Sequence, residues 1–223
     1  MMYFDEPDAA AHIHGPFSDE VMSEVKRADQ IILLLLNQLK LQTTFYDKIN
    51  LIILSDHGMA EISRDRVIIL DELVNKTWYE MYGASPLWTL DPKPQFEDRL
   101  YETLKNASKY HHFSVYKKFE VPQEYHYRHS RRIFKLVVVA DDGYDIVDNW
   151  HRIGEEQFNP VWGNHGYNNS LESMRPTFIA HGPAFRTNYE KYEDFENVDL
   201  YPLFGYVLEM FPISHYPSNG SIR

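Results

Sequence analysis

Three short clusters of aspartate and histidine have the residue types and spacing of a metal site. Asp8 and His12 lie four residues apart, so a helix would place both side chains on one face. Asp56 and His57 follow a run of four apolar residues, and His165 stands in the stretch GNHGY. Aspartate and histidine without cysteine are ligands of hydrolytic zinc centres, and two such metals can hold both reacting oxygens of a phosphoryl transfer. Each cluster alone is a weak signal.

The pattern of apolar residues predicts the elements that position these side chains. We expect a helix from Ser18 to Leu39, with Ser18 or Asp19 as its N-cap, followed by a buried strand at Leu51–Leu54. A helix that leads into a continuous apolar strand is typical of an α/β fold with a parallel sheet. The other expected elements are a strand end at Met1–Phe4, an apolar run at 66–73, a helix at 96–107, strands at Leu136–Ala140 and 176–185, and a closing helix at 197–211.

The composition sets outer limits on what the chain can be. Its 223 residues, 43% of them hydrophobic, are enough for one sizeable domain or a large fragment of one. A net charge of −11 argues against binding to nucleic-acid duplexes, which depends on a basic surface. There is no cysteine, so disulfides and thiolate metal sites are excluded. The longest apolar run, IILLLL at 31–36, is too short to span a bilayer.

The start of the chain and its sequons bear on localisation. The first residues, MMYFDEPD, lack the basic and apolar regions of a signal peptide. N-glycosylation sequons, which weakly favour passage through the secretory pathway, begin at Asn75, Asn106, Asn168 and Asn219.

Most of the other polar residues have simpler interpretations. The sequence DDG at 141–143 is better explained as a turn that ends a strand than as a magnesium site. Histidines without support from a metal-site motif are interpreted as ordinary polar or loop residues; they are His14, His111, His112, His126, His129, His151, His181 and His215.

Three long blocks of sequence resemble one known family. YFDEPDAAAHIHGP, LIILSDHGM and GNHGYNNSLESMRPTFIAHGPAF are similar, in order and in separation, to blocks of the ectonucleotide pyrophosphatase/phosphodiesterase family of the alkaline-phosphatase superfamily. The similarity extends over nearly the whole chain. It implies part of an alkaline-phosphatase-like α/β domain, with a largely parallel central sheet flanked by helices.

The resemblance also implies roles for individual residues. It assigns Asp8, His12 and His165 to one zinc ion, and Asp56 and His57 to a second zinc ion. It places Tyr3 at the nucleotide pocket. In the family, a threonine attacks the phosphorus to give a covalent intermediate, which water then hydrolyses.

The sequence departs from the family in two places. Ala11 replaces the glycine that usually precedes the first histidine ligand, for which we expect only a slight backbone adjustment. The family's nucleophilic threonine and a further aspartate ligand come well before the EPD block. None of this chain's threonines has the matching context; they are Thr43, Thr44, Thr77, Thr89, Thr103, Thr177 and Thr187.

These departures define what we expect of the chain itself. Residues 1–223 are predicted to form the C-terminal portion of a type I phosphodiesterase/nucleotide pyrophosphatase catalytic domain, without the N-terminal portion. The missing portion would supply the rest of the sheet and the signal peptide. The chain alone is expected to hold one well-formed zinc site of the two and to be inactive, because no nucleophile is present.

Three functional hypotheses remain open from the sequence. The first is a zinc-dependent hydrolase of phosphodiester or pyrophosphate bonds in nucleotides or related substrates, at the cell surface or outside the cell, with any membrane anchor outside this chain. The second is an inactive truncated fragment that binds metal or acts as an interaction module. The third, a phosphomonoesterase or sulfatase-like enzyme, is disfavoured by the EPD and NHGYNN blocks. The choice between a nucleotide and a phospholipid head group as substrate is left open.

Overall fold

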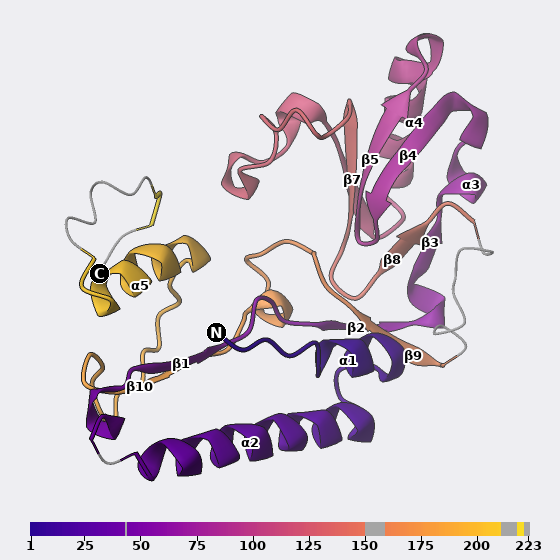
Figure 1. Ribbon diagram of the computed structural model, residues 1–223. Coiled ribbons are helices and arrows are strands. Elements are labelled where there is room, and N and C mark those ends of the chain that lie inside the picture. Colours follow the sequence, from indigo (N-terminus) through magenta and orange to yellow (C-terminus); the bar gives the residue numbers. More distant parts are fainter. Residues whose placement is uncertain (43, 150–158, 211–217, 221–223) are drawn as a thin grey trace. The chain divides into compact units, whose positions relative to one another are not determined.

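The computed structural model describes residues 1–42, 44–149, 159–210 and 218–220, and these residues fall into two compact units (Figure 1). The first unit comprises Met1–Leu33 and Ser55–Thr177, and the second comprises Leu34–Leu54 and Phe178–Arg223. Every residue predicted to bind metal belongs to the first unit.

Two helices begin the first unit. Helix α1 spans Asp8–His14, and helix α2 spans Asp19–Lys40, with its last part in the second unit. The Ser18 hydroxyl accepts a hydrogen bond of 3.2 Å from the backbone N–H of Val21, which confirms Ser18 as the residue that caps α2.

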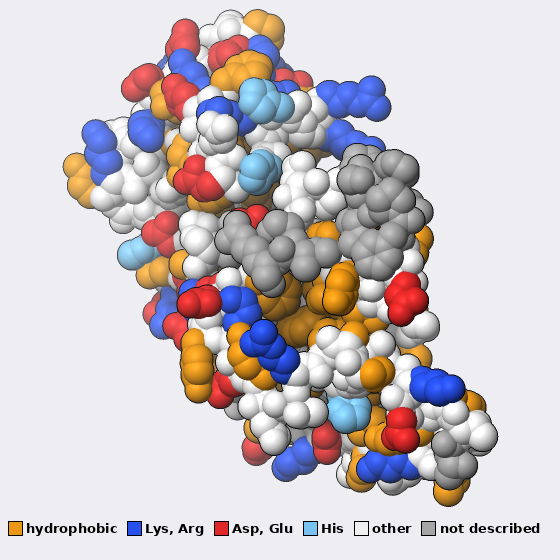
Figure 2. All heavy atoms as spheres, turned by 90° about the vertical axis from the view of Figure 1, so that its left-hand side faces the viewer, with side chains coloured by type: hydrophobic (Ala, Val, Ile, Leu, Met, Phe, Trp, Pro, Cys, Tyr) orange, Lys and Arg blue, Asp and Glu red, His pale blue; other side chains and the backbone are white. Residues whose placement is uncertain are grey.

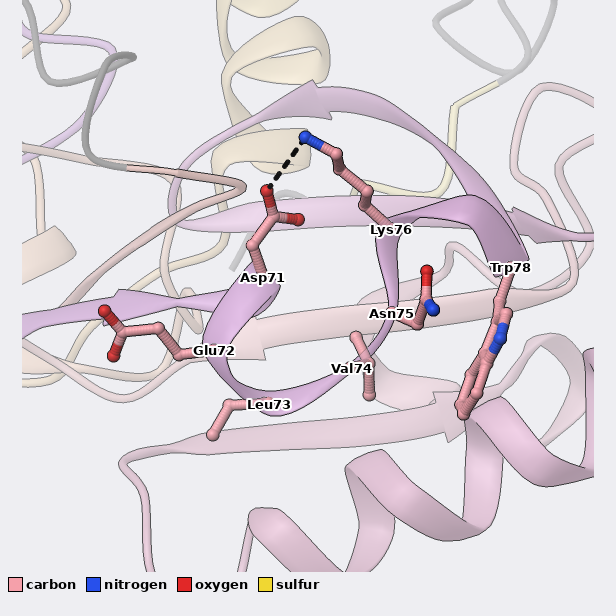
Figure 3. Close-up of a pocket in the computed structure, with 7 residues that line it drawn as sticks. All are labelled: Asp71, Glu72, Leu73, Val74, Asn75, Lys76 and Trp78. Carbon is pink, nitrogen blue, oxygen red and sulfur yellow. Dashed lines mark ion pairs between the residues drawn. The ribbon is translucent and has the colours of Figure 1, made fainter.

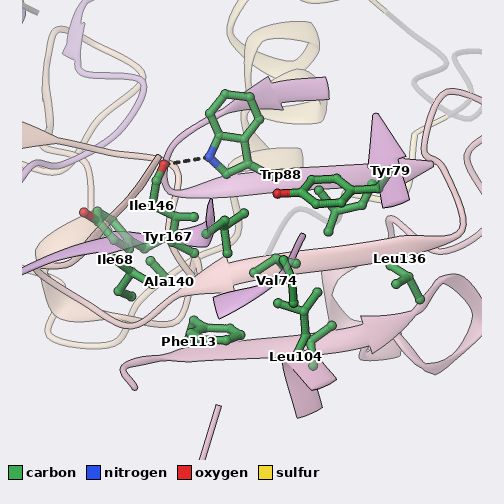
Figure 4. Packing of buried hydrophobic residues seen from close by; sticks show 14 of the residues in the cluster. Ile68, Val74, Tyr79, Trp88, Leu104, Phe113, Leu136, Ala140, Ile146 and Tyr167 are labelled. Atoms are coloured by element: carbon green, nitrogen blue, oxygen red, sulfur yellow. Dashed lines mark hydrogen bonds between the residues drawn. The ribbon is translucent and has the colours of Figure 1, made fainter. Parts of the chain in front are cut away.

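A four-stranded antiparallel sheet contributes a large part of the core of this unit (Figure 4). Its order is β4 (Tyr79–Ala84), β5 (Leu87–Pro92), β7 (Leu136–Ala140) and β6 (Phe113–Lys117). Helix α4 (Glu97–Ala107) contributes the fully buried Leu100 and Leu104 to the same core. The helix predicted at 96–107 and the strand predicted at Leu136–Ala140 are therefore confirmed.

Two shorter ladders lie closer in sequence to the predicted ligands. Strand β2 (Ala60–Ser63) pairs antiparallel with β9 (Val161–Asn164), and β3 (Val67–Ile69) pairs parallel with β8 (Asp145–Val147). The short helix α3 (Leu70–Leu73) follows β3, so the apolar run at 66–73 divides between a strand and a helix.

The second unit contains one two-stranded ladder. Strand β1 (Leu51–Leu54) pairs antiparallel with β10 (Phe178–His181), and helix α5 (Leu200–Val207) follows later in the chain. Among the described residues, the short 3-10 helices are η1 (Tyr46–Lys48), η2 (Arg64–Arg66), η3 (Lys76–Trp78), η4 (Pro94–Phe96), η5 (Lys118–Glu120), η6 (Gln123–Tyr125), η9 (Glu172–Met174) and η10 (Asn197–Asp199).

The α/β class is confirmed, but the expected strand direction is wrong for the ladders described. Only β3–β8 is parallel, whereas β1–β10, β2–β9 and the four-stranded sheet are antiparallel. Strand β7 shows the physical reason. All its residues are buried because Val138 faces the main core while Val137 and Val139 face a smaller cluster. Burial on both faces gives a continuous apolar run in a strand of either direction.

Three other expectations are corrected. Met1–Phe4 forms no strand and is exposed. Strand β1 is half-buried rather than buried, and Leu54 is exposed. The helix expected at 197–211 is shorter, since 197–199 form η10 and α5 ends at Val207. The last residue of that expected helix, Phe211, lies outside the described residues.

Candidate metal centre

Helix α1 presents Asp8 and His12 one turn apart, as the sequence predicts. The Asp8 Oδ2 atom lies 3.5 Å from Nε2 of His12. Ala10 and Ala11 are buried with Val21, so the opposite side of the helix is anchored. The structure accommodates Ala11 at the position where the family usually has glycine.

Close contact with β9 fixes the position of α1 (Figure 1). A Cβ atom added to Gly163 would lie 2.5 Å from the carbonyl oxygen of Ala11, so glycine is required at this point of the strand. The same Gly163 contributes a carbonyl oxygen 2.8 Å from Nδ1 of His12. The helix backbone and the His12 ring are thus both positioned against one residue of β9.

The segment that carries Asp56 and His57 is held by hydrogen bonds to residues 174–177. The N–H of Ser55 donates to the Thr177 carbonyl, and the Thr177 N–H donates to the Ser55 hydroxyl at 2.7 Å. The Gly58 N–H donates to the Met174 carbonyl at 3.0 Å. These bonds fix the backbone of the segment from which the His57 side chain extends.

His165 is the first residue after β9, and its imidazole lies against the rings of His57 and His12. It stacks on His57 with ring centroids 3.5 Å apart and an interplanar angle of 13°. Its centroid is 5.0 Å from that of His12. The family resemblance assigns His12 and His165 to one zinc ion and His57 to a second, and the structure brings the three imidazoles together from distant parts of the chain.

The Asp8 carboxylate faces all three imidazoles. Its Oδ1 lies 3.5 Å from Nε2 of His165 and 3.9 Å from Nε2 of His57. This oxygen is buried and has no hydrogen-bond partner among the residues that the structure describes. Ligand atoms of Asp8, His57 and His165 all lie within 4.8 Å of one another. Two ligands of one tetrahedral zinc lie roughly 3.3 Å apart, since each zinc–nitrogen bond is about 2.0–2.1 Å long. The donor set and its spacing therefore fit a divalent metal.

Hydrogen bonding sets the tautomers of two of the histidines. The Nδ1 of His12 faces the Gly163 carbonyl, and the Nδ1 of His57 lies 2.9 Å from the Gly58 carbonyl. A carbonyl oxygen only accepts, so each Nδ1 carries a proton, and in the neutral imidazole the lone pair is then on Nε2, the atom that faces Asp8. This arrangement is usual for histidines that bind metal.

The surroundings of His165 favour the neutral form of its imidazole. Burial of the imidazole, and then the charge of His57, lowers the pKa of His165 below its ordinary value of 6.5, although Asp8 opposes this effect. A neutral imidazole is the form that coordinates a cation.

Asp56 and Tyr3 lie in more open positions than the other predicted site residues. The Asp56 Oδ2 atom is 3.6 Å from Nε2 of His57, and its side chain is 72% exposed. Tyr3 is 80% exposed, so its ring is accessible to a ligand.

Two of the histidines that had no motif support can be placed on described elements or contacts. His112 pairs with Asp141 at 3.6 Å and stacks on Tyr144, and His181 lies in β10 of the second unit. Residues Thr43, His151 and His215 lie outside the described residues.

Two residues that support His165 were not predicted from the sequence. Asn164 accepts a hydrogen bond from the His165 backbone N–H, and the buried Asp145 binds Asn164 in turn. Asn164 was visible inside the GNHGY block. Asp145 had no signal beyond its place in the apolar stretch YDIV, where its carboxylate is almost completely buried.

A separate hollow of about 550 Å³ lies beside α3 (Figure 3). Asp71 and Lys76, two of the residues that line it, form an ion pair of 3.9 Å. Its lining contains none of the predicted metal ligands; it consists of Asp71, Glu72, Leu73, Val74, Asn75, Lys76 and Trp78. This hollow is therefore distinct from the candidate metal centre.

The α/β domain of this chain thus brings together the donor set of a metal site, with one carboxylate facing three imidazole nitrogens. The family model for type I phosphodiesterase/nucleotide pyrophosphatase matches residues 1–168, and the chain belongs to that family.

Individual relatives agree with this assignment. Human bis(5'-adenosyl)-triphosphatase ENPP4 is 38% identical over 221 residues, which are 99% of this chain and 46% of that protein. The solved structure of murine ectonucleotide pyrophosphatase/phosphodiesterase 5 has a TM-score of 0.86 and 38% identity, and the match covers 99% of this chain and 56% of that one. An inactive form of the same murine protein, in complex with AMP, matches with the same TM-score and identity over 55% of its chain. The predicted alkaline-phosphatase-like fold is thereby confirmed. The chain spans about half the length of these relatives.

Proposed function

We propose that this chain provides metal ligands to a zinc-dependent hydrolase of phosphodiester or pyrophosphate bonds in nucleotides. The observation that carries the proposal is the meeting of Asp8, His57 and His165, whose ligand atoms lie within 4.8 Å of one another. Aspartate and histidine form hydrolytic zinc sites. Membership of the phosphodiesterase/nucleotide pyrophosphatase family supports the reaction class.

The proposal assigns the five ligands to two zinc ions. Asp8, His12 and His165 would hold one ion, and Asp56 and His57 would contribute to the other. The first site is the better formed within these 223 residues, because it has three protein ligands and a fourth position open to water or phosphate. Asp8 lies within 4 Å of imidazole nitrogens from both groups, which supports two adjacent ions.

Bound zinc would supply a Lewis acid that polarises a phosphoryl oxygen and offsets its negative charge. The chain's own residues have separate tasks in this account. The carbonyls of Gly163 and Gly58 orient two imidazoles, and the buried oxygen of Asp8 provides the negative charge that attracts a cation. The attacking group is assigned to none of this chain's threonines, so we propose that the chain alone does not turn over substrate.

A nucleotide is the proposed substrate. The murine relative in complex with AMP supports a nucleotide ligand for the family fold. In this chain the exposed ring of Tyr3 precedes Asp8 by only a few residues, and an exposed aromatic ring provides a surface on which a base can stack. We therefore propose Tyr3 as a contact of the nucleoside part of the substrate.

A cell-surface or extracellular location is proposed for the protein. The relatives named as ectonucleotide enzymes and the sequons of this chain both support it. None of the helices in the described ranges combines the length and apolarity needed to cross a bilayer. On the face shown in Figure 2, basic side chains are interspersed with acidic ones.

The test is hydrolysis of an aryl ester of a nucleotide by the full-length protein. We expect turnover that a chelator removes and added zinc restores. His165→Ala should lower kcat/KM by more than the 10- to 100-fold typical of an outer-shell change, whereas His112→Ala should leave it unchanged. Zinc binding without any turnover would support the alternative of a non-catalytic metal-binding protein. Turnover that persists in the chelator would overturn the proposal.

A further inference from the structure

Asp145 is a buried acid whose partners are all uncharged in the part of the chain that the structure describes. It is 2% exposed and lies in β8, where every residue is buried. Its Oδ1 accepts hydrogen bonds from the Ser85 hydroxyl at 2.6 Å and the Asn164 side-chain amide at 2.7 Å. Its Oδ2 accepts from the Trp162 indole at 2.8 Å. An acid buried at this depth is costly unless its hydrogen bonds are well made.

Two of these donors come from alternate residues of β9. Trp162 and Asn164 are two positions apart, so they point to the same face of the strand. Asp145 therefore holds the C-terminal end of β9, immediately before His165. The ladder between β2 and β9 ends at this point, with the pair Ala60 and Asn164.

Asn164 connects Asp145 to the backbone of His165 by hydrogen bonds. Its Nδ2 faces two acceptors, the Asp145 carboxylate and the Ser85 carbonyl at 3.3 Å. That orientation turns its Oδ1 toward the His165 backbone N–H, which donates to it at 2.9 Å. Only one orientation of the amide satisfies all of these groups, because Nδ2 donates and Oδ1 accepts.

We propose that Asp145 is a positioning residue for the metal centre, acting through Asn164 on the backbone of His165. The inference rests on the proposed metal site. The imidazole of His165 lies 3.5 Å from Asp8, so a shift of its backbone would change the spacing on which ligation depends. Partners that orient metal ligands typically change metal affinity by 10- to 100-fold when they are removed.

The test compares zinc affinities of the full-length protein, measured by competition with a chelator. Asp145→Asn should lower the affinity about 10-fold or more, because one amide oxygen cannot accept from all three donors. Asn164→Asp should also lower it, because two carboxylates would then face each other. The double variant D145N/N164D should regain affinity relative to Asn164→Asp, since the amide of residue 145 then donates to the carboxylate of residue 164.

Trp88→Phe is the matched control for a loss of stability alone. It removes a buried hydrogen bond of 2.8 Å to the carbonyl of Ile146, the neighbour of Asp145 in β8, and Trp88 takes no part in the hydrogen bonds that connect Asp145, Asn164 and His165. We expect its zinc affinity to stay close to that of the wild type, and the visible spectrum of bound Co²⁺ to change in Asp145→Asn and not in Trp88→Phe.

Three results would overturn this inference. They are an unchanged zinc affinity in Asp145→Asn, an equal loss in Trp88→Phe, or no recovery in the double variant. If the wild-type protein bound no zinc, the proposed function itself would fail, and that outcome is distinguishable from a failure of Asp145 alone.

Discussion

The Nε2 atom of His165 lies 3.5 Å from the Oδ1 atom of Asp8, although the two residues come from opposite ends of the first unit's sequence. The same carboxylate oxygen is 3.9 Å from Nε2 of His57. A cation bound by these groups would link α1 to the segments that flank β2 and β9. Metal binding should therefore contribute to the stability of the fold as well as to chemistry.

Zinc is expected to stabilise the native protein. A ligand that binds only the native state adds about 2.7 kcal/mol at a concentration 100 times its Kd. Thermal unfolding of the chelated wild type should shift to a higher Tm when zinc is restored. Asp8→Asn and His165→Ala should lose most of this shift, whereas His112→Ala should keep it. An equal shift in all four proteins would place the zinc elsewhere.

Stability of the metal-free protein should depend on pH through His165. Its folded-state pKa is lowered below 6.5 by burial and by the neighbouring His57, so the unfolded state binds the proton more readily. The free energy of unfolding should therefore fall as the pH is lowered from 6.5 toward the folded-state pKa. Denaturant titrations of chelated protein between pH 7 and pH 5 measure this slope. The slope should be smaller in His165→Gln, and an identical slope there would assign the effect to other groups.

Local features of the site could be predicted from the sequence, but long-range ones could not. The shared face of Asp8 and His12 follows from helix geometry alone. The approach of His165 to Asp8 depends on tertiary contacts, and only the family resemblance anticipated it. Asp145 could not be found, because an acid in a short apolar strand is normally expected to face solvent. Strand direction was mispredicted for a similar reason. An apolar run such as β7 indicates that the strand is buried, but it does not indicate whether the neighbouring strands are parallel or antiparallel.

Gly163 should tolerate no side chain. In Gly163→Ala the new methyl group would meet the Ala11 carbonyl at 2.5 Å, so α1 and β9 must separate. Overpacking of this kind costs about 1 to 3 kcal/mol. Zinc affinity should fall as well, because the Gly163 carbonyl orients His12. Chemical denaturation and chelator competition measure the two effects. Gly205→Ala, inside α5, is the control and should be neutral or stabilising. A Gly163→Ala protein with wild-type stability would contradict the described packing.

Asn75 is the sequon residue that we expect to carry a glycan in a eukaryotic secretory host. It is exposed, and its Oδ1 accepts from the Thr77 N–H at 2.9 Å and the Thr77 hydroxyl at 2.8 Å, which leaves the amide nitrogen for the sugar. Asn106 is also exposed but lies in α4, whereas Asn168 is half-buried near His165. Asn75→Gln should reduce the mobility shift produced by glycosidase treatment, and Asn168→Gln should not. A mobility shift that is lost only in Asn168→Gln would contradict the prediction that the glycan is carried by Asn75.

Anomalous X-ray scattering at the zinc absorption edge tests the metal centre most directly. Crystals of the full-length protein grown with zinc should show an anomalous peak about 2.0–2.2 Å from an oxygen of Asp8 and from Nε2 of His165. A second peak is expected next to Asp56 and His57. Anomalous density bound to other residues, or none near Asp8 in zinc-saturated crystals, would contradict the assignment of these residues to a zinc centre.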